Sequence, residues 1–356
     1  MDTLFLEHYK KWSVILEKTL EINNKSRIDK RHSILPESHP IWHQSSVPTI
    51  KDCDVAFKEY AVQFAEDAAK KAIADWGGAT TDITHVVAAT CSNTSSPGFD
   101  AELSRRLGLG KNTQRILVQG LGCAGGVAAL RTAYHHLLAA VNQDKPARAL
   151  VISCEAMSIF ARNELDNIIN KQLPSVAPAL FGDCSSAMVL SNGIGVKTSE
   201  KEPIWNILGV QTTLLATPGC IEYNIGYLAV ITKEVPKQIA LALPSGFQEL
   251  IASTECLRSE KSNFDPATYD WALHPGGYMI INIGQEALGL SPHHLRKTYE
   301  AYTTAGNTGA STVLSIMDKL AHERASGGDA RDKVVGVAFG PDITMEMVLL
   351  MKPSCG

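Results

Sequence analysis

The segment that most constrains this fold is residues 115–131, RILVQGLGCAGGVAALR. An apolar run at 116–118 predicts a short buried strand, two glycines interrupt it, and an alanine-rich helical pattern then continues to about residue 140. Cys123 therefore lies at a strand-to-helix turn, where the helix dipole and free N–H groups favour a thiolate. Since a lone cysteine is often only a buried core residue, a nucleophile and a core position both remain open. The predicted apolar face of the helix is formed by Val127, Leu130, Tyr134, Leu137 and Leu138.

Composition excludes several classes of function. The chain has 356 residues, 45% of them hydrophobic, and a net charge of −4, which gives no electrostatic reason to expect nucleic acid as a partner. The sequence shows no secretion signal and no apolar stretch of membrane-spanning length. Eight cysteines are scattered without C-x-x-C pairs or Cys/His clusters. We therefore expect a cytoplasmic protein without a disulfide framework or a metal site.

The rest of the pattern predicts an α/β protein made of two similar halves. Apolar runs of strand length occur at 83–90, 147–154, 181–191, 205–212, 269–273, 333–340 and 344–351. Helical patterns lie between them, at 4–24, 55–76, 101–109, 236–252, 278–288, 295–302 and 307–325, whereas 158–175 is predicted only as helix plus loop. Strands flanked by such helices indicate layers around buried sheets. A polar break at 199–203 places the boundary between an N-terminal half, 1–198, and a C-terminal half, 199–356.

Two further residues could complete a site with Cys123. His274 ends an apolar strand and precedes Pro-Gly-Gly, the position where open α/β sheets place functional groups. Histidine can pair with a thiolate. Asn307 follows Gly306 at a loop-to-helix junction, where it could be an ordinary N-cap or an amide donor for a developing oxyanion.

Five motifs carry a resemblance to a known family. In order they are GLGCAGG (120–126), ALFGD (179–183), LHPGG (273–277), GNTGAS (306–311) and AFGP (338–341). The chain resembles type III polyketide synthases, the chalcone-synthase-like enzymes of the thiolase fold, from about residue 16 to nearly its end. The sequence between the motifs is closer in character to the fungal members than to the plant ones. The resemblance implies two related α/β halves that form a layered αβαβα core.

The resemblance also implies a mechanism. Cys123 would take an acyl group from acyl-CoA, while His274 and Asn307 would bind malonyl-CoA, stabilise the enolate formed by decarboxylation and support Claisen attack on the bound acyl group. Such chemistry needs a covalent acyl carrier and a place for enolate charge. It requires no cofactor and no metal, because the CoA thioesters are substrates.

Other family positions map onto the cavity and the CoA site. Phe181 matches a gate phenylalanine, and Ala229 stands where a second gate phenylalanine is expected, so we expect a wider passage. Cys220, Gly309 and Ser96 match cavity positions, Ser96 reaching into the partner subunit's cavity. Two lysines, Lys18 and Lys25, match residues that bind the CoA phosphates.

Three departures from the family accompany these matches. Glu21 replaces a third basic residue of the CoA site. Asp342 replaces a glycine after Gly340-Pro341, in a loop that lines the cavity. The family's opening strand is not seen, so we expect a weakened first sheet.

From these features we expect a homodimeric enzyme that extends a fatty acyl-CoA with malonyl-CoA and releases alkylpyrones, alkylresorcinols or resorcylic acids. One alternative is a ketoacyl synthase that initiates fatty acid synthesis on acyl carrier protein, although Pro275-Gly-Gly argues against it. Two others are a catalytically silent lipid-binding relative and a cysteine hydrolase. Product formation that depends on malonyl-CoA would distinguish the expected synthase from a hydrolase, which would only hydrolyse acyl-CoA.

Overall fold

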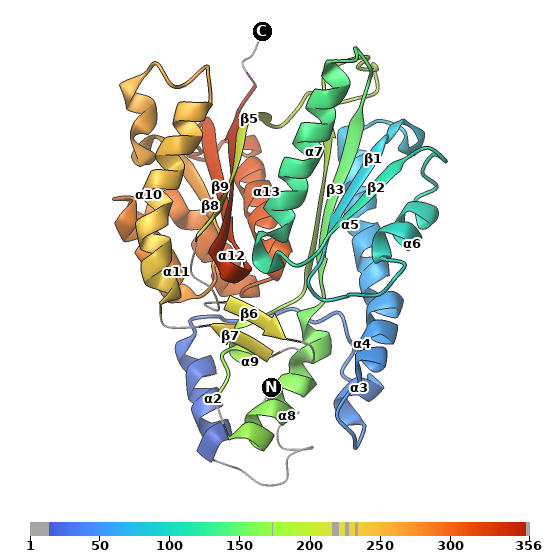
Figure 1. Cartoon of the computed structure of the whole chain (residues 1–356), viewed down its shortest axis with the longest axis vertical. Coiled ribbons are helices and arrows are strands. Elements are labelled where there is room, and N and C mark those ends of the chain that lie inside the picture. Colours follow the sequence, from blue (N-terminus) through green and yellow to red (C-terminus); the bar gives the residue numbers. More distant parts are fainter. Residues whose placement is uncertain (1–13, 173, 216–220, 225–227, 232–233, 354–356) are drawn as a thin grey trace.

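The N-terminal half is built on a four-stranded sheet. The computed structural model describes residues 14–172, 174–215, 221–224, 228–231 and 234–353 (Figure 1). In this sheet the order is β2-β1-β3-β4, with β1 parallel to β2 and β3, and β4 antiparallel to β3. The strands are β1 His85–Ala89, β2 Gln114–Val118, β3 Arg148–Glu155 and β4 Cys184–Ser191. Every residue of β1 and β3 is buried, as expected for strands covered on both faces.

The C-terminal half repeats three of these four strands, and its fourth strand lies at the other edge of the sheet. Its sheet has the order β5-β10-β9-β8, with β8 parallel to β9, and β10 antiparallel to both β9 and β5. The strands are β5 Asn206–Leu214, β8 Asp270–Leu273, β9 Lys333–Phe339 and β10 Thr344–Met351. The series β8-β9-β10 therefore corresponds to β1-β3-β4. A separate hairpin pairs β6 Ile221–Asn224 with β7 Leu228–Ile231.

Two helices fill the space between the sheets. Helix α7 (Gly125–Val141) precedes β3, and α13 (Thr312–Ala325) precedes β9, so they occupy equivalent places in the two halves. Figure 1 shows both helices in the middle of the molecule. One buried cluster joins them to both sheets and includes Val87, Val127 and Val334.

Outer helices cover the far face of each sheet. Because neighbouring side chains alternate across a strand, Val86 of β1 points away from α7 and packs with the helices that cover the first sheet. The helices around the first half are α2 Val14–Lys25, α3 Pro40–His43, α4 Ile50–Ala56, α5 Val62–Trp76, α6 Phe99–Arg106, α8 Ala161–Lys171 and α9 Ala177–Leu180. The second sheet is covered by α10 Val235–Ser253, α11 Tyr278–Ala287 and α12 Arg296–Ala305. The result is the predicted αβαβα core of the thiolase-like fold.

The sequence prediction differs from the structure in a few places. Leu138, predicted on the buried face of α7, is 43% exposed, because the buried face of the helix is formed by other residues, among them Ala133 and Leu137. The helix predicted from residue 55 includes a π-helical turn, Phe57–Ala61, between α4 and α5. Of the helix predicted at 4–24, residues 14–24 lie within α2, and the earlier ones lie outside the described residues.

Glycine at position 126 allows α7 to approach the turn before α13. A Cβ at Gly126 would lie 2.0 Å from the carbonyl oxygen of Ala310, whereas a Cβ at neighbouring Gly125 would make ordinary 3.5 Å contacts with Ala89 and Ala310. The two halves therefore meet backbone to backbone, and only the second glycine is required for this contact.

This pair of glycines gives a matched test. We expect Gly126→Ala to lower the free energy of unfolding by roughly 1–3 kcal/mol or more, because a backbone oxygen cannot move aside without displacing a helix. We expect Gly125→Ala to be neutral or slightly stabilising, since alanine is the better helix former. Chemical denaturation of both variants measures the difference, and equal stabilities would contradict this account of the interface.

Candidate active site

Cys123 lies in the 3₁₀ turn Gly122–Ala124, between the end of β2 and the start of α7. It is buried, with 7% of its surface exposed. Its Sγ donates a hydrogen bond to Oδ1 of Asn307 over 3.9 Å. The structure therefore brings together two predicted site residues that are 184 positions apart in the chain.

The amide of Asn307 is oriented by the turn that follows it. The backbone N–H of Gly309 donates to Asn307 Oδ1 over 2.9 Å, so the oxygen must face the turn. The main chain is fixed as well, because Asn307 N–H donates to Leu180 O and Gly182 N–H donates to Asn307 O. These bonds leave the N–H₂ end of the side chain as the donor that can serve a ligand. Asn307 therefore caps the turn through its side-chain oxygen, while its N–H₂ group is the end available to a ligand.

His274 follows the last residue of β8 and is held by its backbone N–H, which donates to Val337 O. The side chain is 2% exposed, and its Nδ1 is buried without a hydrogen-bond partner among the described residues. Burial lowers the pKa of His274 from 6.5 to about 3. The imidazole is therefore neutral at physiological pH, and a buried ring nitrogen without a partner can be satisfied by a substrate.

The sequence prediction missed Glu155, the last residue of β3. It is fully buried, and its carboxylate accepts hydrogen bonds from Ser92 Oγ (2.8 Å), Cys91 N (3.1 Å) and Ala310 N (3.3 Å). Burial raises the pKa of Glu155 from 4.5 to about 7, and the hydrogen bonds partly offset this effect. A carboxylate directly after a buried apolar strand, ALVISCE, is the sequence signal that could have identified it.

Gly309 lies where Glu155 meets the turn after Asn307. Its φ is +56°, and a Cβ there would lie 2.9 Å from Glu155 Cγ and 3.1 Å from Met157 Cε. The residue predicted to leave space in the cavity therefore gives that space to the Glu155 side chain.

The other predicted gate and cavity residues lie in different settings. Phe181 is half-buried, and its main chain forms a parallel bridge with Asn307. Ser96 is exposed and precedes Pro97 through a cis peptide bond. The main chain of Ala229 pairs with Tyr223 in the small hairpin, and Cys220 lies outside the described residues.

Lys18 and Lys25, the predicted CoA-binding residues, are both exposed on α2. Glu21 forms an ion pair with Lys25 over 3.6 Å, and an exposed pair of this kind contributes little to stability. Glu21 therefore partly neutralises the positive charge that Lys25 could present to a CoA phosphate. Asp342 has a φ of +51°, the left-handed conformation in which a glycine is expected and which Asp tolerates better than most residues.

Among the described residues, no group of three or more His, Cys, Asp or Glu side chains is arranged to hold a metal ion. Within the same residues, none of the helices has the length and apolar character required to cross a membrane.

Comparison with known proteins decides the family. The model of the N-terminal domain of chalcone and stilbene synthases matches residues 5–193, and the model of their C-terminal domain matches residues 208–353. The chain is a type III polyketide synthase of the chalcone and stilbene synthase family. It is thus an acyltransferase. This result confirms the family predicted from the five motifs.

Fungal relatives are similar over nearly the whole chain. Acylalkylpyrone synthase csyB from Aspergillus oryzae is 45% identical over 99% of this chain and 90% of the relative. The type III polyketide synthase pspB from Penicillium soppii is 32% identical over 95% of this chain and 87% of the relative. The crystal structure of CsyB complexed with CoA-SH has a TM-score of 0.96 and covers 99% of this chain and 94% of that one. These relatives are polyketide synthases rather than ketoacyl synthases.

The raised pKa of Glu155 predicts a pH dependence of stability. The folded state binds this proton up to about pH 7, whereas the unfolded chain releases it near pH 4.5, so the contribution of Glu155 to stability falls as the pH rises between these values. Above pH 7 the cost approaches roughly 3 kcal/mol. In the wild type, the loss of this proton lowers the free energy of unfolding between pH 5 and pH 8. We expect this decrease to be smaller in Glu155→Gln, because glutamine has no proton to lose in this range.

Chemical denaturation at the two pH values measures this dependence. Glu202→Gln, at an exposed position, serves as the control that should retain the wild-type dependence. An unchanged pH dependence in Glu155→Gln would show that Glu155 does not carry the proton.

Proposed function

We propose that Cys123 accepts the acyl group of an acyl-CoA as a thioester and that malonyl-CoA then extends it. The observation that carries this proposal is the contact between Cys123 Sγ and Asn307 Oδ1, since it places the thiol beside an amide whose orientation is fixed by Gly309. Loss of CO₂ from malonyl-CoA leaves an enolate of acetyl-CoA. The enolate carbon attacks the thioester carbonyl, the C–S bond to Cys123 breaks, and the thiolate is released.

The neutral state of His274 supports its role in this reaction. An enolate oxygen is stabilised by N–H donors that are already in place and shielded from water. A ring whose pKa is lowered to about 3 donates a hydrogen bond without first losing a proton to the substrate. We therefore assign His274 and the N–H₂ group of Asn307 as the donors for the developing oxyanion, rather than His274 as a charged partner of the thiolate.

For the substrates, we propose a long aliphatic acyl-CoA as the starter and a product of the alkylpyrone, alkylresorcinol or resorcylic acid class. Ala229 replaces a gate phenylalanine of the family, which supports a passage wide enough for a long chain. The name of the relative from Aspergillus oryzae, an acylalkylpyrone synthase, favours the pyrone among these classes. Its structure with CoA-SH supports a CoA thioester as the substrate form.

Incubation with labelled malonyl-CoA and acyl-CoAs of graded length tests this function. We expect products that carry long aliphatic chains, and none from Cys123→Ala. Asn307→Asp should still accept the starter on Cys123, because its carboxylate can accept from Gly309 N–H, but extension should fall by roughly 10²–10³-fold because a negative charge opposes the enolate.

Mass spectrometry of the products and of the acyl-enzyme separates these steps. Ala229→Phe is the matched variant for the passage, and we expect it to shift the preference toward shorter starters. A preference for aromatic starters would contradict the argument from the wide passage. Acyl-CoA hydrolysis without malonyl-dependent products would contradict the proposed condensation.

We also propose that the enzyme is a cytosolic homodimer. Ser96, the position that reaches the partner's cavity in the family, is exposed here on the loop before α6, which supports a contact with a second copy. Sedimentation of the purified protein tests the dimer, and a species of monomer mass at micromolar concentration would contradict it.

A further inference from the structure

Arg27 presents a positive charge at the surface, in the loop that follows α2. Its side chain is exposed, and its guanidinium lies over the ring of Tyr278, with Cζ 3.9 Å from the ring centroid. Within the described part of the chain, no carboxylate forms an ion pair with Arg27. A guanidinium on the face of a ring keeps its N–H groups free at its edges, so it can still bind an anion.

Nearby acidic residues do not cancel this charge. Asp29 is exposed two positions further along the chain, and Glu286 is exposed on α11. Burial raises the pKa of the neighbouring Tyr299, and Arg27 opposes this effect more strongly than Glu286 adds to it. Over residues 17–31 basic side chains outnumber acidic ones. The basic residues are Lys18, Lys25, Arg27, Lys30 and Arg31, and the acidic ones are Glu17, Glu21 and Asp29.

The main chain on both sides holds Arg27 in place. Its φ is +63°, a left-handed conformation that is uncommon for arginine. Before it, Ser26 O accepts a hydrogen bond from the hydroxyl of Tyr302 over 2.8 Å. After it, the N–H of Asp29 donates to Thr303 O over 2.9 Å. The loop is thereby fixed to α12, and strain of this kind is typical of residues that a functional site holds in one position.

The same loop packs directly on the turn that carries Asn307. Helix α12 ends at Ala305, and Gly306 and Asn307 follow it. A Cβ at Gly306 would lie 3.5 Å from Ile28 Cδ1 and 3.3 Å from Arg31 Cγ. The position of the loop after α2 is therefore fixed relative to one of the proposed donors for the enolate.

Tyr278, the ring beneath Arg27, leads to the other proposed donor. It is the first residue of α11 and comes directly after the sequence His274-Pro-Gly-Gly. Arg27 therefore lies at the surface where the chain segments that carry Asn307 and His274 meet the loop after α2. A cation at this place can hold the charged end of a substrate whose reactive end lies at Cys123.

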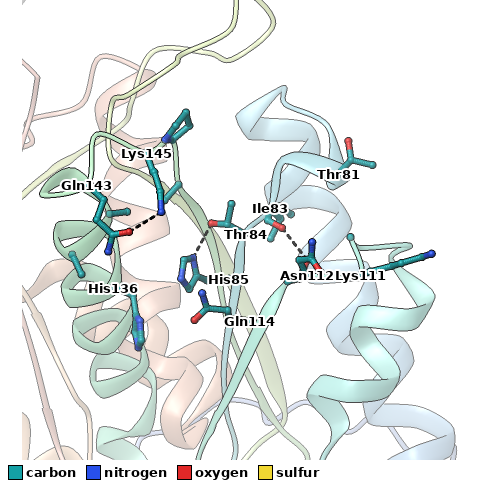
Figure 2. A pocket seen from close by; sticks show the side chains of 16 residues that line it. Thr81, Ile83, Thr84, His85, Lys111, Asn112, Gln114, His136, Gln143 and Lys145 are labelled. Carbon is teal, nitrogen blue, oxygen red and sulfur yellow. Dashed lines mark hydrogen bonds between the residues drawn. The ribbon is translucent and has the colours of Figure 1, made fainter.

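A cavity elsewhere in the molecule does not offer an equivalent place. It has a volume of about 620 Å³ and is lined by His85 and Gln114, the first residues of β1 and β2, whereas Cys123 follows the other end of β2 (Figure 2). Figure 2 shows the side chain of Lys111 directed away from this cavity. An anion bound there would be separated from the thiol by the length of α7, about 25 Å.

We propose that Arg27 binds a phosphate group of the CoA thioester and supplies the positive charge that Glu21 does not. This inference rests on the function proposed above, in which CoA thioesters deliver their acyl groups to Cys123. The guanidinium forms charge-assisted N–H···O bonds with phosphate oxygens. The ring of Tyr278 keeps it in position without neutralising it. Arg27 thus determines the affinity for the CoA carrier and takes no part in the chemistry at Cys123.

Calorimetric titration of the full chain with CoA-SH tests this inference without any need for turnover. We expect Arg27→Met, which keeps an unbranched side chain over the ring, to weaken CoA-SH binding roughly tenfold. In steady-state assays the same variant should raise KM for malonyl-CoA by a similar factor and retain kcat. Its kcat/KM for malonyl-pantetheine, which has no phosphate, should stay unchanged. Arg258→Met, at an exposed arginine paired with Glu255, is the matched control and should bind CoA-SH as the wild type does.

Variants of Tyr278 test how Arg27 is held. Tyr278→Phe keeps the ring face and should bind CoA-SH as tightly as the wild type. Tyr278→Leu should weaken binding several-fold, because the guanidinium is then no longer fixed. Arg27→Met added to Tyr278→Leu should have a smaller effect than Arg27→Met alone, since the two residues act together.

Two results would overturn the role of Arg27. One is an Arg27→Met variant that binds CoA-SH as tightly as the wild type. The other is a loss of kcat/KM for malonyl-pantetheine as large as the loss for malonyl-CoA, because the effect then does not depend on a phosphate. CoA-SH binding that depends on Arg27 in a wild-type protein without condensation activity would support this inference and contradict the proposed function.

Discussion

The close packing of α7 on the turn that follows Asn307 is the constraint on which the candidate site depends. Cys123 and Asn307 belong to different halves and hold equivalent places, each in or beside a 3₁₀ turn that leads into a central helix. Gly126 lets these two turns meet backbone to backbone. A thiol and an amide therefore come together at the contact between two related units, and the geometry of the site is fixed by the packing of the core rather than by a flexible loop.

Burial then determines the charge state of two further residues of the candidate site, His274 and Glu155. His274 has no described partner for Nδ1, so desolvation acts on it without compensation and keeps its ring neutral. Glu155 receives several hydrogen bonds, yet burial still raises its pKa to about 7. Both effects favour the uncharged form of the side chain. In such surroundings, charge that develops on a substrate oxygen interacts strongly with fixed N–H donors, because few other charges or water molecules screen it.

Local patterns in the sequence predicted most of the strands and helices, and the family resemblance predicted their layered arrangement, which the structure confirms. A strand-to-helix turn around Cys123 and a strand end at His274 can be read from neighbouring residues alone. Glu155 was missed because its importance comes from burial against Ala310, which is 155 residues away. Leu138 was misplaced for a similar reason, because periodicity gives the faces of α7 but not which face is covered by the opposite sheet. Tertiary contacts decide both cases.

Helix α7 connects the two ends of the first sheet. Its first residues follow Cys123, and its C-terminal end lies about 25 Å away along a helix of this length. Most of the helix is enclosed between two sheets, and Gly126 fixes its first turn against Ala310. The helix is therefore a rigid element whose first turn positions the thiol. A shift of Cys123 relative to Asn307 would require a second packing arrangement of this helix, and its backbone contact at Gly126 leaves little room for one. The spacing of the thiol and the amide is thus a property of the packed core.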